Sequence, residues 1–132
     1  MGSLAHRRPA GASRSLFREI RQVAIHHALS GEMIDVRPLA GAITSACTAT
    51  LYKTQHLEVF RLVLLAGKQI PEHQVVGELT VQCLEGSVEF SIGTTHDVMR
   101  AGDLKCLAGG IPHALRALED SSVLVTLQLH GA

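Results

Sequence analysis

Residues 74–117 of this 132-residue chain read QVVGELTVQCLEGSVEFSIGTTHDVMRAGDLKCLAGGIPHALRA. In this stretch, short runs rich in Val, Leu, Ile and Thr alternate with turns that contain glycine, at Glu85-Gly86, Ile92-Gly93, Ala101-Gly102 and Gly109-Gly110. Apolar runs separated by turn residues at intervals of about eight to twelve residues are typical of all-β sandwiches and barrels. The stretch therefore predicts an all-β domain built from short strands.

The same pattern extends in both directions and defines the strands that we expect. They cover residues 33–36, 48–53, 57–65, 74–84, 87–92, 95–100, 103–107, 113–117 and 123–129. Gly86 is predicted to lie in a tight hairpin with a positive φ, and Gly102 is predicted to turn the chain before the next strand. These glycines specify the fold and carry no chemistry.

Residues 1–31 differ in character from the rest of the chain. Residues 1–14 are rich in Gly, Ala, Pro, Ser and Arg without apolar periodicity, which predicts a flexible arm. Residues 15–30 show helical spacing of their apolar side chains, with Ser15 as N-cap and Gly31 as terminator. We expect one amphipathic helix there, covered by the barrel of its own chain or by that of a partner in a dimer. The predicted organisation is an arm plus helix in residues 1–31 and a β-barrel domain in residues 32–132.

Composition narrows the function classes. Twelve basic and twelve acidic residues give no net charge, so the chain has no field to hold nucleic acid or an anionic membrane. Aromatic residues make up 3%, with no Trp, which disfavours stacking on bases or sugars. No apolar stretch approaches the roughly eighteen residues that span a bilayer. The three cysteines Cys47, Cys83 and Cys106 follow no zinc-finger spacing and are interpreted as reduced thiols of a cytoplasmic protein.

Two stretches resemble the paired motifs of the cupin superfamily. In the first motif Gly67, His73 and Gly86 are in register, whereas Val75 and Leu79 occupy the positions of the second His and the Glu. In the second motif Gly102, Gly110 and His113 match, and Ala108 and Ala117 replace the Pro and the Asn. The resemblance implies a double-stranded β-helix, the jelly-roll barrel of cupins. The expected fold is thus an all-β cupin-type barrel with one N-terminal helix.

The resemblance also implies where chemistry would take place. Metal-binding cupins hold one divalent transition metal with three His and one Glu at the barrel mouth, and this chain supplies His73 and His113. Strand alternation places Glu78 on the opposite face from His73, although a bulge at Gly77 would turn its carboxylate inward. The candidate metal ligands are therefore His73, His113 and Glu78, for Fe, Mn, Ni or Zn. The alternative for both histidines is a structural role with backbone hydrogen bonds.

A ligand pocket is expected around the same positions. Alternation directs Val75, Leu79, Val81 and Cys83 to the face of His73. His56 and Glu72 are further candidate donors, each with the alternative of a solvated surface residue. Arg61 and Arg116 lie inside β runs, where they either extend to solvent or orient a carboxylate ligand at the mouth.

These features support several functions. The first is a cupin barrel, predicted to be a homodimer, that binds a small molecule at its mouth, with weak or absent metal binding. The alternative is a metal-dependent dioxygenase or isomerase acting on a small acid, with His73 and His113 as ligands. A metal-free variant uses one of these histidines as general base. A scaffold role is a further alternative. Fold alone does not choose between binding and catalysis.

Overall fold

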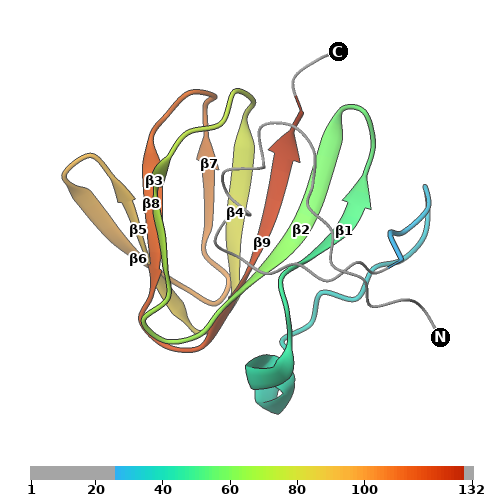
Figure 1. The fold of residues 1–132 in the computed structure, drawn as a ribbon, viewed down its shortest axis with the longest axis horizontal. Coiled ribbons are helices and arrows are strands. Elements are labelled where there is room, and N and C mark those ends of the chain that lie inside the picture. Colours follow the sequence, from blue (N-terminus) through green and yellow to red (C-terminus); the bar gives the residue numbers. More distant parts are fainter. Residues whose placement is uncertain (1–25, 130–132) are drawn as a thin grey trace.

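The computed structural model describes residues 26–129, which form two antiparallel β-sheets. The strands are β1 (Ala49–Lys53), β2 (Leu57–Leu64), β3 (Gln69–His73), β4 (Leu79–Glu85), β5 (Ser87–Ile92), β6 (Thr95–Arg100), β7 (Leu104–Leu107), β8 (His113–Ala117) and β9 (Ser121–Gln128). The 3-10 helix η2 (Ala40–Ser45) precedes β1. The larger sheet has the order β1-β2-β9-β4-β7, as Figure 1 shows, and the smaller has the order β3-β8-β5-β6.

The core lies between the two sheets. Every paired strand is antiparallel. Side chains alternate between the two faces of a strand, so one face of each sheet points toward the interior. The most deeply buried apolar side chains come from both sheets and include Phe60, Leu62, Leu64, Val81, Val88, Phe90 and Val123. This arrangement is the two-sheet jelly-roll predicted from the sequence. Positive φ angles, which favour glycine, occur in the turns at Gly67, Gly86, Gly93, Gly102 and Gly110.

Most of the expected strands are confirmed. The predicted bounds 87–92, 95–100 and 113–117 coincide with β5, β6 and β8, and those of β1, β2, β7 and β9 shift by at most two residues. Gly86 shows why the β4–β5 turn needs glycine. Its φ is +79°, and a Cβ at this position would lie 2.3 Å from the carbonyl oxygen of Asp120.

The single strand expected over residues 74–84 is wrong. The chain instead forms β3 (Gln69–His73) in the smaller sheet, has no strand over residues 74–78, and continues as β4 in the larger sheet. The interruption occurs at a close approach of two backbones, because a Cβ on Gly77 would lie 2.0 Å from the carbonyl oxygen of Gln128. Gly109 lies at a similar close approach, because a Cβ at this position would lie 2.0 Å from the carbonyl oxygen of Val76. These two glycines allow the loop between β3 and β4 to pack against its neighbours.

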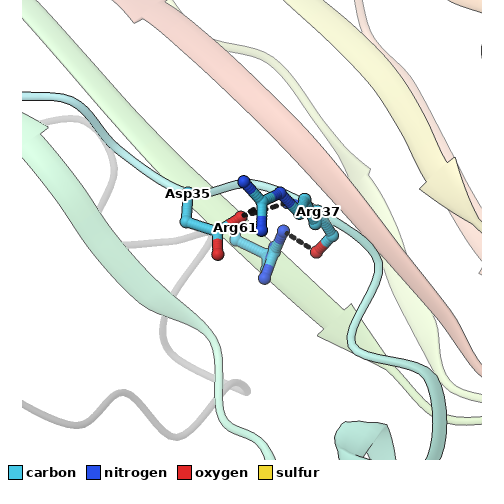
Figure 2. A network of polar contacts seen from close by, with 3 residues as sticks. All are labelled: Asp35, Arg37 and Arg61. Atoms are coloured by element: carbon cyan, nitrogen blue, oxygen red, sulfur yellow. Dashed lines mark hydrogen bonds and ion pairs between the residues drawn. The ribbon is translucent and has the colours of Figure 1, made fainter.

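The strand expected over residues 33–36 is also wrong, because this segment has no partner in either sheet. Side chains of the larger sheet hold the segment that follows it. Arg61 of β2 donates a hydrogen bond from Nη2 to the carbonyl oxygen of Arg37 at 2.7 Å, and Asp35 pairs with the Arg37 side chain (Figure 2). Arg61 therefore has a structural role on the side of β2 opposite to Phe60 and Leu62, and it does not orient a ligand in the interior.

Glu85 is the second residue that anchors the segment over residues 35–45. We call this segment the arm; it is distinct from the flexible arm predicted over residues 1–14. Its carboxylate accepts hydrogen bonds from the backbone N–H groups of Leu39 at 2.8 Å and Ala40 at 3.0 Å, and from the Ser122 hydroxyl at 2.6 Å. Burial acts to raise the pKa of Glu85, but these hydrogen bonds and the charge of Arg61 outweigh it and the pKa is lowered. The carboxylate is thus ionised where it anchors the arm.

The helix predicted over residues 15–30 lies mostly outside the described residues, as does the predicted flexible arm over residues 1–14. Residues 26–30 are described and are not helical. The backbone N–H of Ala28 instead donates to the carbonyl oxygen of Leu51 at 2.8 Å, which places this segment along the edge of β1. Over residues 26–30, the chain thus lies along the exposed edge of β1 in place of the helix that the apolar spacing predicts. Within residues 26–129, no helix is long and apolar enough to cross a membrane.

Candidate functional site

Two histidines meet on neighbouring strands of the smaller sheet. His73 ends β3 and His113 begins β8, and the two are register partners in the antiparallel ladder. Directly opposed residues bring their side chains close together on one face of a sheet. The ring centroids of His73 and His113 are 4.4 Å apart, with an angle of 57° between the ring planes. The pairing of β3 with β8 therefore creates a two-imidazole cluster from residues that are distant in sequence.

Both imidazoles are oriented by the same local hydrogen bond. Nδ1 of His73 lies 3.0 Å from the carbonyl oxygen of Pro71, and Nδ1 of His113 lies 2.8 Å from that of Ile111. A carbonyl oxygen only accepts, so each Nδ1 must carry the hydrogen and donate. In the neutral ring Nε2 then keeps its lone pair. The pair thus presents two nitrogen acceptors.

His113 is neutral because of its surroundings. Its side chain is only 3% exposed, and its ring stacks on Phe90 with the centroids 5.5 Å apart and the planes 3° from parallel. Burial lowers the pKa of His113, the hydrogen bond to Ile111 opposes this shift, and the neighbouring His73 lowers the pKa further. The net shift of the pKa is downward, which favours the neutral ring.

The histidine pair lines a narrow cavity in the barrel interior. The side chains around it are Phe60, Leu62, His73, Val75, Leu79, Val81, His113, Leu115, Val125 and Leu127. The cavity volume is about 20 Å³, which is room for roughly one water molecule. Apart from the two imidazoles the wall is entirely apolar. A ligand can insert only a small group here unless side chains move.

Three of the predicted pocket residues reach this cavity. Val75, Leu79 and Val81 line it together with both histidines. Alternation along one strand does not explain this grouping, because His73 ends β3 of the smaller sheet, Val75 lies in the loop, and Leu79 begins β4 of the larger sheet. Cys83 is buried beyond the cavity wall, where its thiol donates to the carbonyl oxygens of Glu85 and Gly86. Burial raises the pKa of this thiol, as expected of a core residue.

The structure does not bring Glu78 to the histidines. Its backbone N–H donates to Oε1 of Gln128 at 3.1 Å, and its carbonyl oxygen accepts from the backbone N–H of Gln128 at 2.9 Å. Glu78 is exposed and lines a different hollow of about 400 Å³, shared with Thr80, Cys106 and Thr126. Alternation places these three side chains on the outer face of the larger sheet. Gly77 serves the close approach to β9 rather than a bulge that turns Glu78 inward.

His56 and Glu72 are likewise outside the cavity. His56 is exposed in the turn between β1 and β2, where its carbonyl oxygen accepts from the backbone N–H of Leu129. Glu72 is exposed on β3, next to His73. Neither lines the cavity.

Several cavity residues are absent from the sequence-based prediction. Phe60 and Leu62 come from β2, Leu115 from β8, and Val125 and Leu127 from β9. Alternation within the predicted strands 57–65, 113–117 and 123–129 marks all of them as candidates for an inward face. The missing information was which inward residues surround the histidines, because that depends on how the two sheets pack.

A resident divalent metal does not fit the side chains present. Structural and catalytic sites for such metals use three or four protein donors. Within residues 26–129, no three His, Cys, Asp or Glu side chains lie close enough together to hold a metal ion. The candidate site offers two imidazole nitrogens in an apolar wall.

Comparison with solved structures identifies the fold. A conserved protein of unknown function from Streptococcus pyogenes superposes with a TM-score of 0.64 at 24% identity, over 82% of this chain and 96% of that one. A cupin superfamily protein from Desulfitobacterium hafniense gives a TM-score of 0.65 at 14% identity, over 77% and 99%. An RmlC-like cupin from Desulfovibrio desulfuricans gives 0.58 at 24% identity, over 80% and 95%. The chain has the cupin fold. No family model matches its sequence, and no curated protein matches it significantly.

The cavity lining can be compared with the metal-ligand positions that the sequence resemblance implies. The resemblance noted in the sequence assigns the family's ligand positions to His73, Val75, Leu79 and His113. All four line the same cavity of this structure. The four positions that the resemblance assigns to metal ligands therefore lie around one cavity, and two of them carry hydrocarbon side chains.

Proposed function

We propose that this cupin-fold protein binds a small molecule at the barrel mouth and holds divalent metals weakly or not at all. The supporting observation is that Val75 and Leu79 stand beside His73 and His113, at the positions where the family resemblance implies further metal ligands. An isopropyl and an isobutyl group cannot donate electron pairs to a metal. They do form a suitable wall for the apolar part of an organic ligand.

The polar part of such a ligand would meet the histidine pair. Most small-molecule sites combine an apolar lining with a few oriented polar groups that fix the ligand. Here the two imidazoles are the polar groups, and the carbonyls of Pro71 and Ile111 fix their orientation. The stacking of His113 on Phe90 further limits its rotation. Preorganisation of this kind reduces the entropy cost of binding.

Methyl-resolved NMR tests this function directly. Titration of the protein with a library of small neutral and charged fragments should shift the methyl signals of Val75, Leu79, Leu115 and Leu127, which surround the cavity. The methyls of Val98 and Leu118, both exposed away from the cavity, serve as controls and should not respond. If no fragment moves the cavity methyls, or if the shifts spread evenly over the surface, the proposal fails.

A metal-dependent enzyme is the second candidate, favoured by the two imidazoles that both keep Nε2 available. It predicts about one Fe, Mn, Ni or Zn per chain, bound by His73 and His113 with non-protein ligands completing the shell. Elemental analysis of protein purified without chelator, beside His73→Ala and His113→Ala variants, separates the two candidates. The binding function predicts no stoichiometric metal in any of the three proteins.

We also propose that the protein is a homodimer, which the sequence suggested. Apolar side chains remain accessible in the described region, including Met33 at 97% and Leu104 at 57% exposure. Multi-angle light scattering on the full chain measures the mass in solution. A mass of one chain at all accessible concentrations would refute the dimer.

A further inference from the structure

The histidine pair is an acceptor site, and this limits what it can bind. Each Nδ1–H is already used by a carbonyl oxygen, that of Pro71 or of Ile111. The nitrogen left on each ring is Nε2, which accepts a hydrogen bond in the neutral ring. A ligand group next to this pair must therefore donate. A carboxylate has no hydrogen to donate and would place its own lone pairs against those of the imidazoles.

Among residues 26–129, no cation compensates for this. Within that part of the chain, no Lys or Arg lines the cavity. Arg61 lies on the other face of β2 and binds the carbonyl of Arg37, and Arg116 pairs with Glu89 at 3.3 Å. The ammonium group of Lys105 lies 5.8 Å from the Phe90 centroid, but it bonds to Asp97 at 2.7 Å. An anion in the cavity would lose its hydration without gaining a charged partner.

The size of the cavity limits how the ligand enters. A volume of about 20 Å³ admits a group the size of a hydroxyl or an amino group. The remainder of the ligand needs room outside this volume, which side chains of the apolar wall such as Val75 and Leu79 would provide by moving. Both side chains are buried and apolar in the absence of ligand. The wall therefore favours a hydrocarbon body with a single small polar end.

We infer that the barrel selects neutral molecules that offer an O–H or N–H donor on an apolar body, such as alcohols, phenols or amides, and rejects the matching carboxylates. The inference rests on the proposed binding function and adds the chemical class of the ligand. It separates this site from one that recognises a small acid.

Matched probes test this selectivity. Phenol, benzoate and benzene share one ring and differ only in the group presented, and cyclohexanol, cyclohexanecarboxylate and cyclohexane form a second set. At pH 8 the neutral donor of each set should bind at least about tenfold more tightly than the carboxylate. The carboxylate cannot donate a hydrogen bond to the imidazoles, and its charge has no cationic partner in the cavity. Calorimetry gives the affinities, and nitrogen chemical shifts of His73 and His113 report whether Nε2 accepts the hydrogen bond.

A variant isolates the role of the imidazole. His113→Phe keeps an aromatic ring against Phe90 but removes one of the two Nε2 acceptors, so it should lower the preference for phenol over benzene by up to about tenfold. Arg116→Gln, which breaks an exposed ion pair on the same strand, should leave the preference unchanged. Tighter binding of the carboxylates would overturn the ligand class while leaving the binding function intact. Absence of binding by every probe at millimolar concentration would overturn both.

Discussion

His73 and His113 are opposed across the β3–β8 ladder, and each donates its Nδ1–H to the carbonyl oxygen two residues before it. One local rule therefore sets the tautomer of both rings. The shared arrangement leaves two Nε2 acceptors in a wall that is otherwise hydrocarbon. The chemistry available to this cupin fold depends on that pair.

The buried histidine makes stability depend on pH. Burial lowers the pKa of His113 in the folded state, so below its ordinary pKa of about 6.5 the unfolded chain binds a proton that the folded chain resists. Stability contributed at this position is present at pH 8 and decreases as the pH falls through the window below 6.5. Replacing His113 with Gln should remove that component, so the variant's free energy of unfolding should fall less between pH 8 and pH 5 than the wild type's. Urea denaturation at several pH values measures it, and parallel profiles would contradict the assignment.

The arm at residues 35–45 depends on one carboxylate. Glu85 accepts hydrogen bonds from the N–H groups of Leu39 and Ala40, so Glu85→Ala should cost on the order of 1–3 kcal/mol of unfolding free energy. Because the pKa of Glu85 is lowered, this contribution is present at neutral pH and is lost as the pH falls through the folded-state pKa.

Hydrogen exchange distinguishes a local effect from a global one. In Glu85→Ala the amides of Leu39 and Ala40 should exchange faster than in the wild type, while those of β5 and β8 keep their protection. Glu89→Ala, which removes a partly exposed ion pair with Arg116, is the matched control and should leave the arm unchanged. Equal acceleration throughout the barrel would show that Glu85 supports the whole fold rather than the arm.

Gly77 should tolerate no side chain. A Cβ at this position would lie 2.0 Å from the carbonyl oxygen of Gln128, so Gly77→Ala must displace backbone and should destabilise the protein by roughly 1–3 kcal/mol or more. Gly41→Ala is the control, because Gly41 has open space around its Cβ position. Thermal unfolding of the two variants measures the difference. A Gly77→Ala melting temperature equal to that of Gly41→Ala would show that the loop between β3 and β4 yields easily.

The ion pair between Asp97 and Lys105 joins the edges of the two sheets. Asp97 lies on β6 and Lys105 on β7, which are edge strands, and their side chains meet at 2.7 Å. Charges on edge strands oppose pairing with other chains. Lys105→Met should therefore change stability by less than about 1 kcal/mol but increase self-association. Dynamic light scattering against concentration measures this, and an unchanged particle size would remove the protective role.

Much of the fold follows from local sequence. The glycine turns separate runs whose alternation matches β5, β6 and β8, because a hairpin and a half-buried strand are each specified by neighbouring residues. The break between β3 and β4 was not predicted, since it depends on the contact of Gly77 with the distant Gln128. Pro71 and Glu72 also obscure β3 as a strand, although it pairs with β8.

The candidate site was only partly predictable. Alternation places Leu79 and Val81 on one face of β4, but the approach of that face to the histidines of the other sheet depends on how the two sheets pack. The sequence could not show that Glu78 binds Gln128 instead of turning inward. Nor could it show that Phe60 and Val125 close the cavity, because they belong to a different sheet from the histidines. Packing between sheets determined these positions.

The most direct test of the central claim restores the two missing donors. We propose that the cavity holds no divalent metal because Val75 and Leu79 supply no donor atoms. The double variant Val75→His with Leu79→Glu should therefore bind one. Wild-type and variant proteins would be incubated with Mn, Fe, Ni and Zn salts, desalted and analysed by inductively coupled plasma mass spectrometry. We predict less than about 0.1 metal per wild-type chain and close to about one per variant chain. About one metal per wild-type chain, lost on His113→Ala, would contradict the account.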